Sequence, residues 1–490
     1  MKKVIIIGSG MGGLLAGNLL AKKGHRVTIF EAHSAPGGYT AGFWRKGHYF
    51  ESGTLSFESS SSIFKAMKEI GVRDKIEFVR QKTRWVSADF SGAPETYDDF
   101  KNLIAAAYPN EKNRLDSYFS EVDKMVRAFK PLMAAKPSPF SMLSAGIRLM
   151  LMYRKYGKIP VGDFTDTYFP RDSLLNRFFR NIGYPDMATW ILGGAIVTLF
   201  DDYWTVKNGM QSWADVMAAQ FKQSGGELLL NTPVEKILTK DGQAIGVACK
   251  DKSYEADYII SASDYKKTFL KLLDSQSSLP FALLDKIKTS AVSEGIFTVY
   301  LGLKLSQERL NTYLKAPHVL YFVDAPGFDI HNSDDAGYFK KASIVLYSPT
   351  LMNPELSPAG KSSLMLQVVT PYHWMNNWGG GDRQEYRRLK DEAKRAVMKT
   401  ATRVIPELMD MIEFEDAATP LTYERYTQNT DGATSAWSWN PKNKFYKNFN
   451  GSFVETPIKN LLIGSCWANQ IGGVPGALGA AYKCVKKIGG

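Results

Sequence analysis

The chain has 490 residues, which is enough for two or three domain cores. Apolar residues make up 44% and charged residues 22%, a composition that excludes a disordered protein. The net charge of +12 permits a nucleic acid or an anionic membrane surface as partner. No zinc spacing, RNA-binding aromatic signature or arginine-rich run accompanies this charge, so we expect no nucleic-acid binding.

The three cysteines, Cys249, Cys466 and Cys484, have no metal-ligand spacing and form no disulfide framework. We therefore expect no bound metal and a reducing, cytoplasmic compartment. The apolar run at residues 4–7 is too short for a signal peptide, and a glycine motif follows it directly, so we expect no export.

Residues 4–7 are β-branched and apolar, as in a buried parallel strand, and Gly8, Gly10 and Gly13 follow at G-x-G-x-x-G spacing. The first glycine permits a tight turn and the second admits a pyrophosphate to the backbone. The third lets a helix, predicted over residues 11–23, pack against the strand. The motif predicts a dinucleotide site with the pyrophosphate at the helix N-terminus.

A second predicted strand, residues 26–30, leads to Glu31, where an acidic side chain can bind a ribose hydroxyl. This acid argues against a 2′-phosphorylated dinucleotide, so FAD and NAD remain, and the pair Gly37-Gly38 favours FAD. No second fingerprint indicates stable NAD binding. The N-terminal residues predicted to bind the cofactor are Gly8, Gly10, Met11, Gly12, Gly13, Glu31, Ala32, Gly37, Gly38, Tyr39 and Thr40.

The alternation over residues 43–50 predicts a hairpin with its turn near Lys46-Gly47. Together with the glycine motif, residues 4–54 resemble the N-terminus of the phytoene desaturase, carotenoid isomerase and retinol saturase flavoproteins, which are relatives of the amine oxidases. In that family the segment matching residues 50–54 passes beside the flavin. The resemblance therefore implies FAD and adds Gly53 and Thr54 to the cofactor site.

Residues 62–205 are predicted to be mainly helical, with helices over 63–70, 97–108, 112–129 and 170–199. Within them, residues 136–158 are rich in Met and Leu, carry basic residues and contain no acidic residue. The segment is too short to span a bilayer but suits a helix lying in the membrane interface. A core helix with a basic end is an equally good interpretation.

The stretch 190–200 is strongly apolar and predicts a buried helix, which Asp201 and Asp202 follow. Neighbours in sequence need not face the same way. We therefore predict a solvated helix end here rather than a pair of catalytic carboxylates.

The chain then returns to the cofactor. A helix is predicted from residue 210 to about 225, followed by a strand over 227–230 that continues through 231–237, and by strands over 244–249 and 258–261. This region resembles the family's second cofactor segment, in which the residue matching Val234 touches the adenine through its backbone. Ser263, just after the last of these strands, joins the predicted cofactor site.

Strands are predicted over residues 295–303, 318–322, 342–348 and 363–370, and a long helix over 382–401. They suggest a substrate lobe. Four tryptophans outside the cofactor segments either line an apolar tunnel or belong to an ordinary core; these are Trp374, Trp378, Trp437 and Trp439.

Near the C-terminus, residues 460–464 predict a strand, and a glycine loop from Gly472 opens a helix. This stretch resembles the family's C-terminal signature. The resemblance implies that Gly464, Gly473, Val474 and Pro475 bind the cofactor, with the positive helix end facing the flavin.

The expected fold is α/β: a two-dinucleotide-binding, Rossmann-like FAD domain with a mixed α+β substrate domain and a helical segment that is a candidate for membrane contact. The FAD domain is predicted to comprise residues 1–70, 205–290 and 445–490. The substrate domain is predicted to comprise residues 71–204 and 291–444, including the candidate membrane helix at 136–158.

The resemblance implies an FAD-dependent oxidoreductase or isomerase that acts on a polyene, isoprenoid or other long apolar lipid, by desaturation, saturation or isomerisation. Two alternatives stay open, a flavin amine oxidase acting on a soluble amine and a flavin-binding adaptor without turnover. The expected location is cytoplasmic, with peripheral contact to the inner face of the membrane. The sequence names no catalytic acid or base, and it leaves the oligomeric state open.

Overall fold

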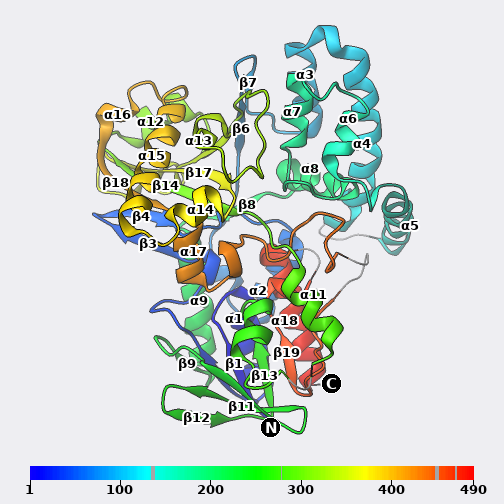
Figure 1. The fold of residues 1–490 in the computed structure, drawn as a ribbon, viewed down its shortest axis with the longest axis vertical. Helices are drawn as coiled ribbons and strands as arrows, with labels where there is room; N and C mark the ends of the chain where they lie inside the picture. Colours follow the sequence, from blue (N-terminus) through cyan, green and yellow to red (C-terminus); the bar gives the residue numbers. More distant parts are fainter. Residues whose placement is uncertain (134–137, 277–278, 447–451, 470–471, 490) are drawn as a thin grey trace.

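The computed structural model describes residues 1–490 except 134–137, 277–278, 447–451, 470–471 and 490. Segments from the start, middle and end of the chain meet in a parallel five-stranded sheet of order β19-β13-β1-β2-β9. Figure 1 shows this sheet in the lower half of the molecule, with both termini near its foot. Its strands are β1 (Lys3–Ile7), β2 (Arg26–Phe30), β9 (Glu227–Leu229), β13 (Tyr258–Ser261) and β19 (Leu461–Ile463).

The central strand β1 is buried on both faces, which suits its β-branched sequence. Helix α1 (Met11–Lys22) follows it and packs closely on β2 at Gly17, where a Cβ would lie 2.8 Å from Cδ1 of Ile29. The predicted strands at 4–7 and 26–30 and the predicted helix at 11–23 are confirmed to within one residue.

A separate antiparallel sheet contains β10 (Lys236–Lys240), β11 (Gln243–Cys249) and β12 (Lys252–Glu255). The predicted continuation of one strand through residues 227–237 is wrong. Strand β9 ends at Leu229, and Asn231 has a φ of +50°, so the chain turns away and β10 begins a different sheet. No strand was expected at β12 because its sequence, Lys-Ser-Tyr-Glu, has no apolar alternation.

A larger seven-stranded sheet of order β18-β14-β17-β16-β15-β6-β7 lies at the upper left of Figure 1. Its strands are β6 (Thr83–Val86), β7 (Ser91–Gly92), β14 (Gly295–Leu303), β15 (His318–Tyr321), β16 (Ile344–Tyr347), β17 (Ser362–Thr370) and β18 (Ile412–Ala418). The four predicted strands between residues 295 and 370 and the predicted helix at 382–401 are confirmed. The accompanying elements are α12 (Gln307–Leu314), α13 (Tyr338–Lys341), the turn α14 (Trp374–Gly379), α15 (Arg383–Ala401) and α16 (Leu408–Met411).

A block of helices occupies the upper right of Figure 1 and encloses its own aromatic core. Its members are α3 (Tyr97–Ala107), α4 (Lys112–Met133), α5 (Pro139–Tyr156), α6 (Val161–Asp166), α7 (Leu174–Arg180) and α8 (Leu192–Asp201). The single helical stretch predicted at 170–199 is wrong. Gly183, with a φ of +89°, and Pro185 separate α7 from α8, and they place Tyr184 in the connection.

The two carboxylates after α8 have different environments. Asp201 lies at the surface, 3.3 Å from the Lys130 ammonium, as a solvated helix end requires. Asp202 is buried and accepts hydrogen bonds from the amide and hydroxyl of Ser60 and from the indole of Trp204. The prediction of a solvated end is therefore wrong for Asp202, which joins the helical block to the first residue of α2.

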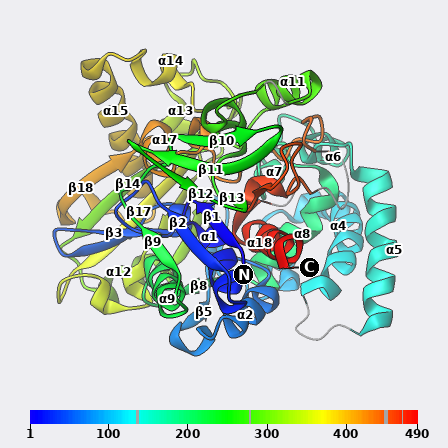
Figure 2. The ribbon, with the colours of Figure 1, turned by 90° about the horizontal axis from the view of Figure 1, so that it is seen from below.

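Helix α5 confirms that the basic, Met-rich segment is helical, although residues 136 and 137 of that segment lie outside the described residues. Both Figure 1 and Figure 2 place α5 at the outer edge of the molecule, beside α4. Across the part of the chain that the structure describes, no helix combines the length and apolar character needed to cross a membrane.

The remaining elements connect the two sheets and the helical block. They are β3 (Gly42–Arg45), β4 (His48–Glu51), α2 (Ser60–Glu69), β5 (Phe78–Arg80), β8 (Trp204–Val206), α9 (Met210–Gln223), α10 (Tyr265–Lys267), α11 (Phe281–Thr289), α17 (Pro420–Thr427) and α18 (Gly473–Gly489). The predicted hairpin is confirmed as β3–β4. One core cluster combines buried side chains from residues 4–78, 206–287 and 433–488, so three distant chain segments fold together.

Glu51, at the end of β4, fixes the hairpin to the start of α9. Its buried carboxyl accepts a hydrogen bond from the hydroxyl of Tyr49 at 2.8 Å and from the amide of Met210 at 3.1 Å. Burial raises the pKa of Glu51 to about 8 although both hydrogen bonds oppose the shift. The folded protein therefore holds a proton on Glu51 that the unfolded chain releases near a pH of 4.5.

This shift predicts how stability depends on pH. Because the folded pKa lies above the unfolded one, the free energy of unfolding of the wild type falls as pH rises from about 4.5 to about 8. In Glu51→Gln the fall over this range is smaller, whereas in the exposed control Glu95→Gln it equals that of the wild type. Urea unfolding at a series of pH values measures the free energy of unfolding of each protein. If this free energy depends on pH in the same way in the wild type and in Glu51→Gln, the raised pKa is not that of Glu51.

Candidate functional site

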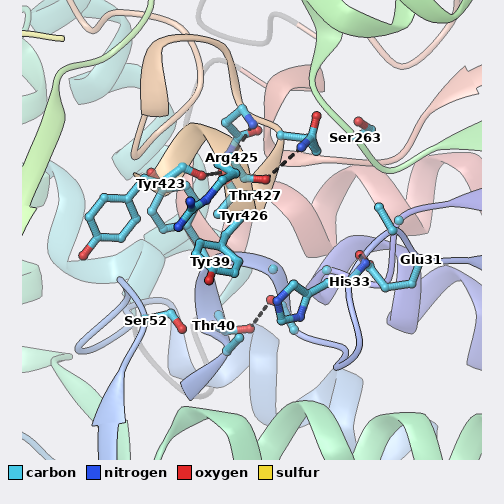
Figure 3. A pocket seen from close by; sticks show the side chains of 18 of the residues that line it. Glu31, His33, Tyr39, Thr40, Ser52, Ser263, Tyr423, Arg425, Tyr426 and Thr427 are labelled. Carbon is cyan, nitrogen blue, oxygen red and sulfur yellow. Dashed lines mark hydrogen bonds between the residues drawn. The ribbon is translucent and has the colours of Figure 1, made fainter. Parts of the chain in front are cut away.

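A cavity of about 1260 Å³ opens at the carboxyl ends of β1, β2 and β13. This is the edge of a parallel sheet where ligands bind in doubly wound folds. Its volume exceeds the range of about 300–1,000 Å³ that holds a drug-sized ligand, so the cavity has room for a dinucleotide and part of a second molecule. Figure 3 shows its polar wall, with Glu31 and His33 on one side and residues of α17 on the other.

The glycine motif forms the floor of this cavity. Gly8 has a φ of +98°, which permits the turn after β1, and Gly10 is the N-cap of α1 with no side chain bonded to the first turn. A Cβ on Gly10 would meet no atom within 4 Å. Gly8, Gly10, Met11 and Gly12 therefore expose their backbone, and the positive end of α1, to the cavity.

Glu31 lies at the end of β2, as predicted, and it also organises the loop. Its Oε2 accepts hydrogen bonds from the amide and hydroxyl of Ser9, each at 2.7 Å, and its Oε1 accepts one from the His33 amide at 2.9 Å. These bonds fix the carboxylate against the glycine loop. Oε1, which accepts only one of these bonds, keeps a further lone pair with which to accept a bond from a ribose hydroxyl.

The segment after Glu31 turns back over the glycine loop. Gly37 has a φ of +123° and donates its amide to the carbonyl of Ser9, and the Thr40 hydroxyl donates to the Gly37 carbonyl at 2.7 Å. Tyr39 stacks on Tyr423 of α17 with ring centroids 5.7 Å apart. The glycine pair thus brings the N-terminal segment into contact with residues almost 400 positions later.

The middle and C-terminal segments complete the walls with Val234, Ser263, Cys466, Gly473 and Val474. The carbonyl of Ser263 accepts a bond from the Ser465 hydroxyl, which fastens the two segments together. Helix α18 begins at Gly473 and points its N-terminus at the cavity, as the sequence predicts. Burial raises the pKa of the Cys466 thiol to about 12, so this cysteine is a neutral wall residue.

Fifteen of the nineteen residues predicted to bind the cofactor line this one cavity. They are Gly8, Gly10, Met11, Gly12, Glu31, Ala32, Gly37, Gly38, Tyr39, Thr40, Thr54, Val234, Ser263, Gly473 and Val474.

The other four predicted cofactor residues, Gly13, Gly53, Gly464 and Pro475, lie behind the residues that line the cavity. A Cβ on Gly13 would lie 2.1 Å from the carbonyl oxygen of Gly8, and a Cβ on Gly53 would lie 2.4 Å from the Tyr39 ring. Gly464 lies behind Gly12, and Pro475 follows Val474 within the first turn of α18. The missing side chain lets Gly13 approach the backbone of Gly8, whereas at Gly53 and Gly464 it leaves room for the side chains of Tyr39 and Ile260.

Helix α17 is the part of the site that the sequence did not reveal. Tyr423, Arg425 and Tyr426 project from it toward the N-terminal segment, and the rings of Tyr426 and His33 meet edge to face with centroids 5.4 Å apart (Figure 3). The helix therefore roofs the cavity. Its local signal is a capping box from Thr419 to Thr422, which marks a helix start but says nothing of a ligand.

Basic side chains gather along the same wall, where Lys267, Lys271 and Arg425 line the cavity. The acidic residue Asp416 also lines it, but its carboxylate is paired with Lys390 and with a neighbouring amide. Lys267 is paired with Glu424 at 3.6 Å, so Lys271, Arg425 and the N-terminus of α1 are the groups that suit a pyrophosphate, which carries negative charge. The residues present therefore fit a dinucleotide.

The four tryptophans considered as tunnel lining lie in packed cores instead. Trp374 and Trp378 belong to the core of the seven-stranded sheet, Trp437 to the core around the five-stranded sheet, and Trp439 to the helical block. None of the four lines the cavity. The core interpretation is the one that the structure supports.

Comparison with known proteins agrees with this geometry. Residues 11–488 match the family model described as flavin containing amine oxidoreductase. Among curated proteins, the chain is 24% identical to an all-trans-retinol 13,14-reductase of Danio rerio, covering 98% of this chain and 84% of that protein. It is 26% identical to a 4,4'-diapophytoene desaturase of Methylomonas sp, covering 91% of this chain and 88% of that protein. It is 24% identical to a prolycopene isomerase of an Oncidium hybrid, covering 87% of this chain and 74% of that protein.

Solved structures show the same fold at lower identity. A putrescine oxidase bound to putrescine superposes with a TM-score of 0.67 at 15% identity, covering 99% of this chain and 98% of that one. Cyclohexylamine oxidase from Brevibacterium oxydans gives a TM-score of 0.62 at 13% identity, with both chains fully covered. The predicted fold class is confirmed, and the cofactor is FAD, as the sequence predicts.

Gly10 faces the cofactor space and Gly13 packs against the protein backbone, so replacing each of them with alanine is expected to have a different effect. In Gly10→Ala the added methyl meets no protein atom and the φ of −66° is permitted, so the apoprotein keeps its stability while the methyl occupies cofactor space. We expect FAD affinity to fall at least about tenfold. In Gly13→Ala the methyl clashes with the Gly8 carbonyl, so the apoprotein itself loses about 1–3 kcal/mol.

Thermal unfolding of the apoproteins and titration of FAD by fluorescence measure the two effects separately. Wild-type FAD affinity in Gly10→Ala would show that the cofactor does not approach the loop at this residue.

Proposed function

Because the chain belongs to the flavin containing amine oxidoreductase family, we propose that its bound FAD acts on a polyene, isoprenoid or other long apolar lipid by desaturation, saturation or isomerisation. The observation that carries this proposal is that relatives covering most of the chain are a retinol reductase, a carotenoid desaturase and a carotenoid isomerase. FAD supplies the two-electron chemistry when bound. The protein supplies position and exclusion of water.

We also propose that residues 1–70, 205–290 and 445–490 form the FAD-binding domain and that residues 71–204 and 291–444 form the substrate domain. Support comes from the core clusters. One cluster unites side chains from residues 4–78, 206–287 and 433–488, while two others belong almost entirely to residues 85–200 and 297–417.

The residues at the flavin end of the cavity suit an apolar substrate. The hydroxyl of Tyr423 lies 2.7 Å from that of Thr298 and 3.1 Å from that of Tyr300, so these polar groups satisfy one another. What the two tyrosines offer to a ligand is ring surface. Of the two acidic side chains that line the cavity, Glu31 is bound by Ser9 and His33 and Asp416 is paired with Lys390, so neither is free to bind a soluble amine. Amine oxidation is therefore not favoured.

An anaerobic titration tests this function. We expect the yellow holoprotein to react with at least one member of a panel of carotenoid precursors, retinol and unsaturated fatty acids. A product that differs by two hydrogens, with bleaching of the flavin, indicates desaturation. Altered polyene absorbance without a mass change indicates isomerisation. Turnover of putrescine but of no polyene would establish the amine alternative, and binding without any product would establish an adaptor.

Helix α5 supports a second part of the proposal, peripheral contact with an anionic membrane on the cytoplasmic side. Its buried residues Ala145, Leu149 and Tyr156 face the protein. The opposite side exposes large apolar side chains at helical spacing, so a core role explains only one face of the helix. The exposed apolar residues of α5 are Phe140, Met142, Leu143, Ile147, Met150 and Leu151.

The charges beside this face suit lipid headgroups. Arg148 and Arg154 are exposed, and residues 138–158 contain no acidic residue. Lys155 differs, because its ammonium lies 2.7 Å from the carboxylate of Glu121 on α4. Lys155 therefore fastens α5 to the protein. Burial of one such apolar side chain is worth about 1.5–3 kcal/mol, so several can hold the protein at a bilayer surface.

Liposome flotation tests the contact with phosphatidylcholine vesicles that contain or lack phosphatidylserine. We expect Leu143→Glu/Ile147→Glu to lower binding at least about tenfold, since two charges would enter the apolar layer. Arg148→Glu/Arg154→Glu removes the preference for phosphatidylserine. The matched control is Phe281→Glu, whose ring is 85% exposed on α11, away from α5. Equal loss in this control, or no loss in the α5 variants, would refute the assignment.

A further inference from the structure

Glu58 is a titratable residue next to the wall of the cofactor cavity, beside the wall residue Gly473, and no sequence motif marks it. It lies in the link between β4 and α2, four residues after Thr54 of the cavity wall. The chain is anchored on both sides of it. Phe57 exchanges two backbone hydrogen bonds with Trp204, at 2.7 and 2.9 Å, and Ser60 donates two bonds to Asp202. Glu58 is thus held in place by its neighbours.

The backbone at this point is strained as well as anchored. Ser59 has a φ of +61°, a left-handed conformation that a non-glycine residue adopts at a cost of about 1–3 kcal/mol. It redirects the chain between Glu58 and the first turn of α2. Strain of this kind persists where surrounding contacts enforce it, and such positions cluster at functional sites.

The Glu58 carboxyl points to the start of α18. Its Oε1 lies 3.8 Å from the position that a Cβ would occupy on Gly473, and Gly473 is both a wall residue of the cavity and the first residue of α18. Close by, Gly472 packs against Ser435, whose hydroxyl lies 3.3 Å from that of Tyr184. Glu58 and Tyr184 therefore lie next to the start of α18, Glu58 beside the wall residue Gly473 and Tyr184 beside Ser435.

The carboxyl has no basic partner, since no ion pair of the described residues includes Glu58. The titratable groups that face it are Asp202 after α8, Tyr203 before β8, and Tyr184, which in turn faces Cys466. Burial, with a smaller contribution from Asp202, raises the pKa of Glu58 to about 7. The side chain is half-buried, so it keeps some accessible surface.

We infer that Glu58 is the catalytic residue that exchanges a proton with the substrate at the flavin. This inference rests on the proposed function. In desaturation, one carbon loses a hydride, whose two electrons reduce the flavin, and the neighbouring carbon loses a proton to the Glu58 carboxylate as the double bond forms. In saturation, which would also need an external two-electron donor to reduce the bound FAD, the Glu58 carboxyl would give its proton to one carbon while the other receives a hydride.

The other acidic groups of the cavity are occupied or distant from this end. Glu31 is bound by Ser9 and His33, and Asp416 is bound by Lys390. Glu294 is also half-buried with a pKa raised to about 7, but its carboxyl faces Asp186 and His331 instead of α18. Glu294→Gln is therefore the matched control for Glu58→Gln, since it removes an acid of similar burial and pKa from another position.

The first arm of the test needs no substrate. The visible spectrum of bound oxidised FAD is recorded between about pH 5.5 and 8.5 in wild type, Glu58→Gln and Glu294→Gln. We expect a spectral transition near the pKa of Glu58, about 7, in wild type and Glu294→Gln and none in Glu58→Gln. A transition that survives in Glu58→Gln would show that Glu58 does not lie beside the flavin and would overturn the inference.

The second arm uses the polyene that the wild type converts. We expect kcat to fall at least about 100-fold in Glu58→Gln with little change in KM, FAD content or thermal unfolding, and to recover in part in Glu58→Asp. For desaturation kcat rises with pH through about 7, and for saturation it falls, because the carboxylate and the acid are needed respectively.

A kcat within about threefold of the wild type in Glu58→Gln would overturn the inference and leave the proposed function intact. If the wild type converts no polyene, the proposed function fails, and the spectral arm alone decides whether Glu58 lies at the flavin.

Discussion

The close approach of glycine backbones at the foot of α1 determines where everything else can lie. A Cβ on Gly12 would lie 2.1 Å from the carbonyl oxygen of Gly464, and one on Gly13 would lie 2.1 Å from that of Gly8. These contacts lock the N-terminal helix against both its own strand and the C-terminal strand. As a result α1 and α18, which are separated by most of the chain, both begin at one cavity, and their positive ends act together.

The parts of the fold that the sequence predicted are those whose signal is local. Runs of β-branched residues marked β1, β2 and β14 to within a residue, because a buried parallel or central strand needs apolar side chains on both faces. The errors have tertiary causes. Asn231 turns the chain out of one sheet and into another, and the polar strand β12 exists only because β11 pairs with it. Neither event changes the apolar pattern that sequence analysis follows.

The cofactor site shows the same division. The glycines, Glu31 and the C-terminal loop were predictable because their spacing encodes a turn, a helix start and a strand end. Helix α17 carries no such code, since Tyr423 and Tyr426 acquire a role only when Tyr39 and His33 lie opposite them. The burial of Asp202 was unpredictable for the same reason, because it depends on a contact with Ser60, which lies 142 residues earlier in the chain.

Glu58 and α5 share a property that distinguishes them from the rest of the molecule. A half-buried carboxyl without a basic partner and an apolar helix face open to water each lower the stability of the fold. Stability alone would favour a salt bridge at Glu58 and polar side chains on the exposed face of α5. A lipid ligand explains both the unpaired carboxyl and the exposed apolar face. The face of α5 contacts the lipid in the membrane, and the Glu58 carboxyl contacts it at the flavin. A cation near Glu58 would keep the acid ionised, so it could no longer return a proton.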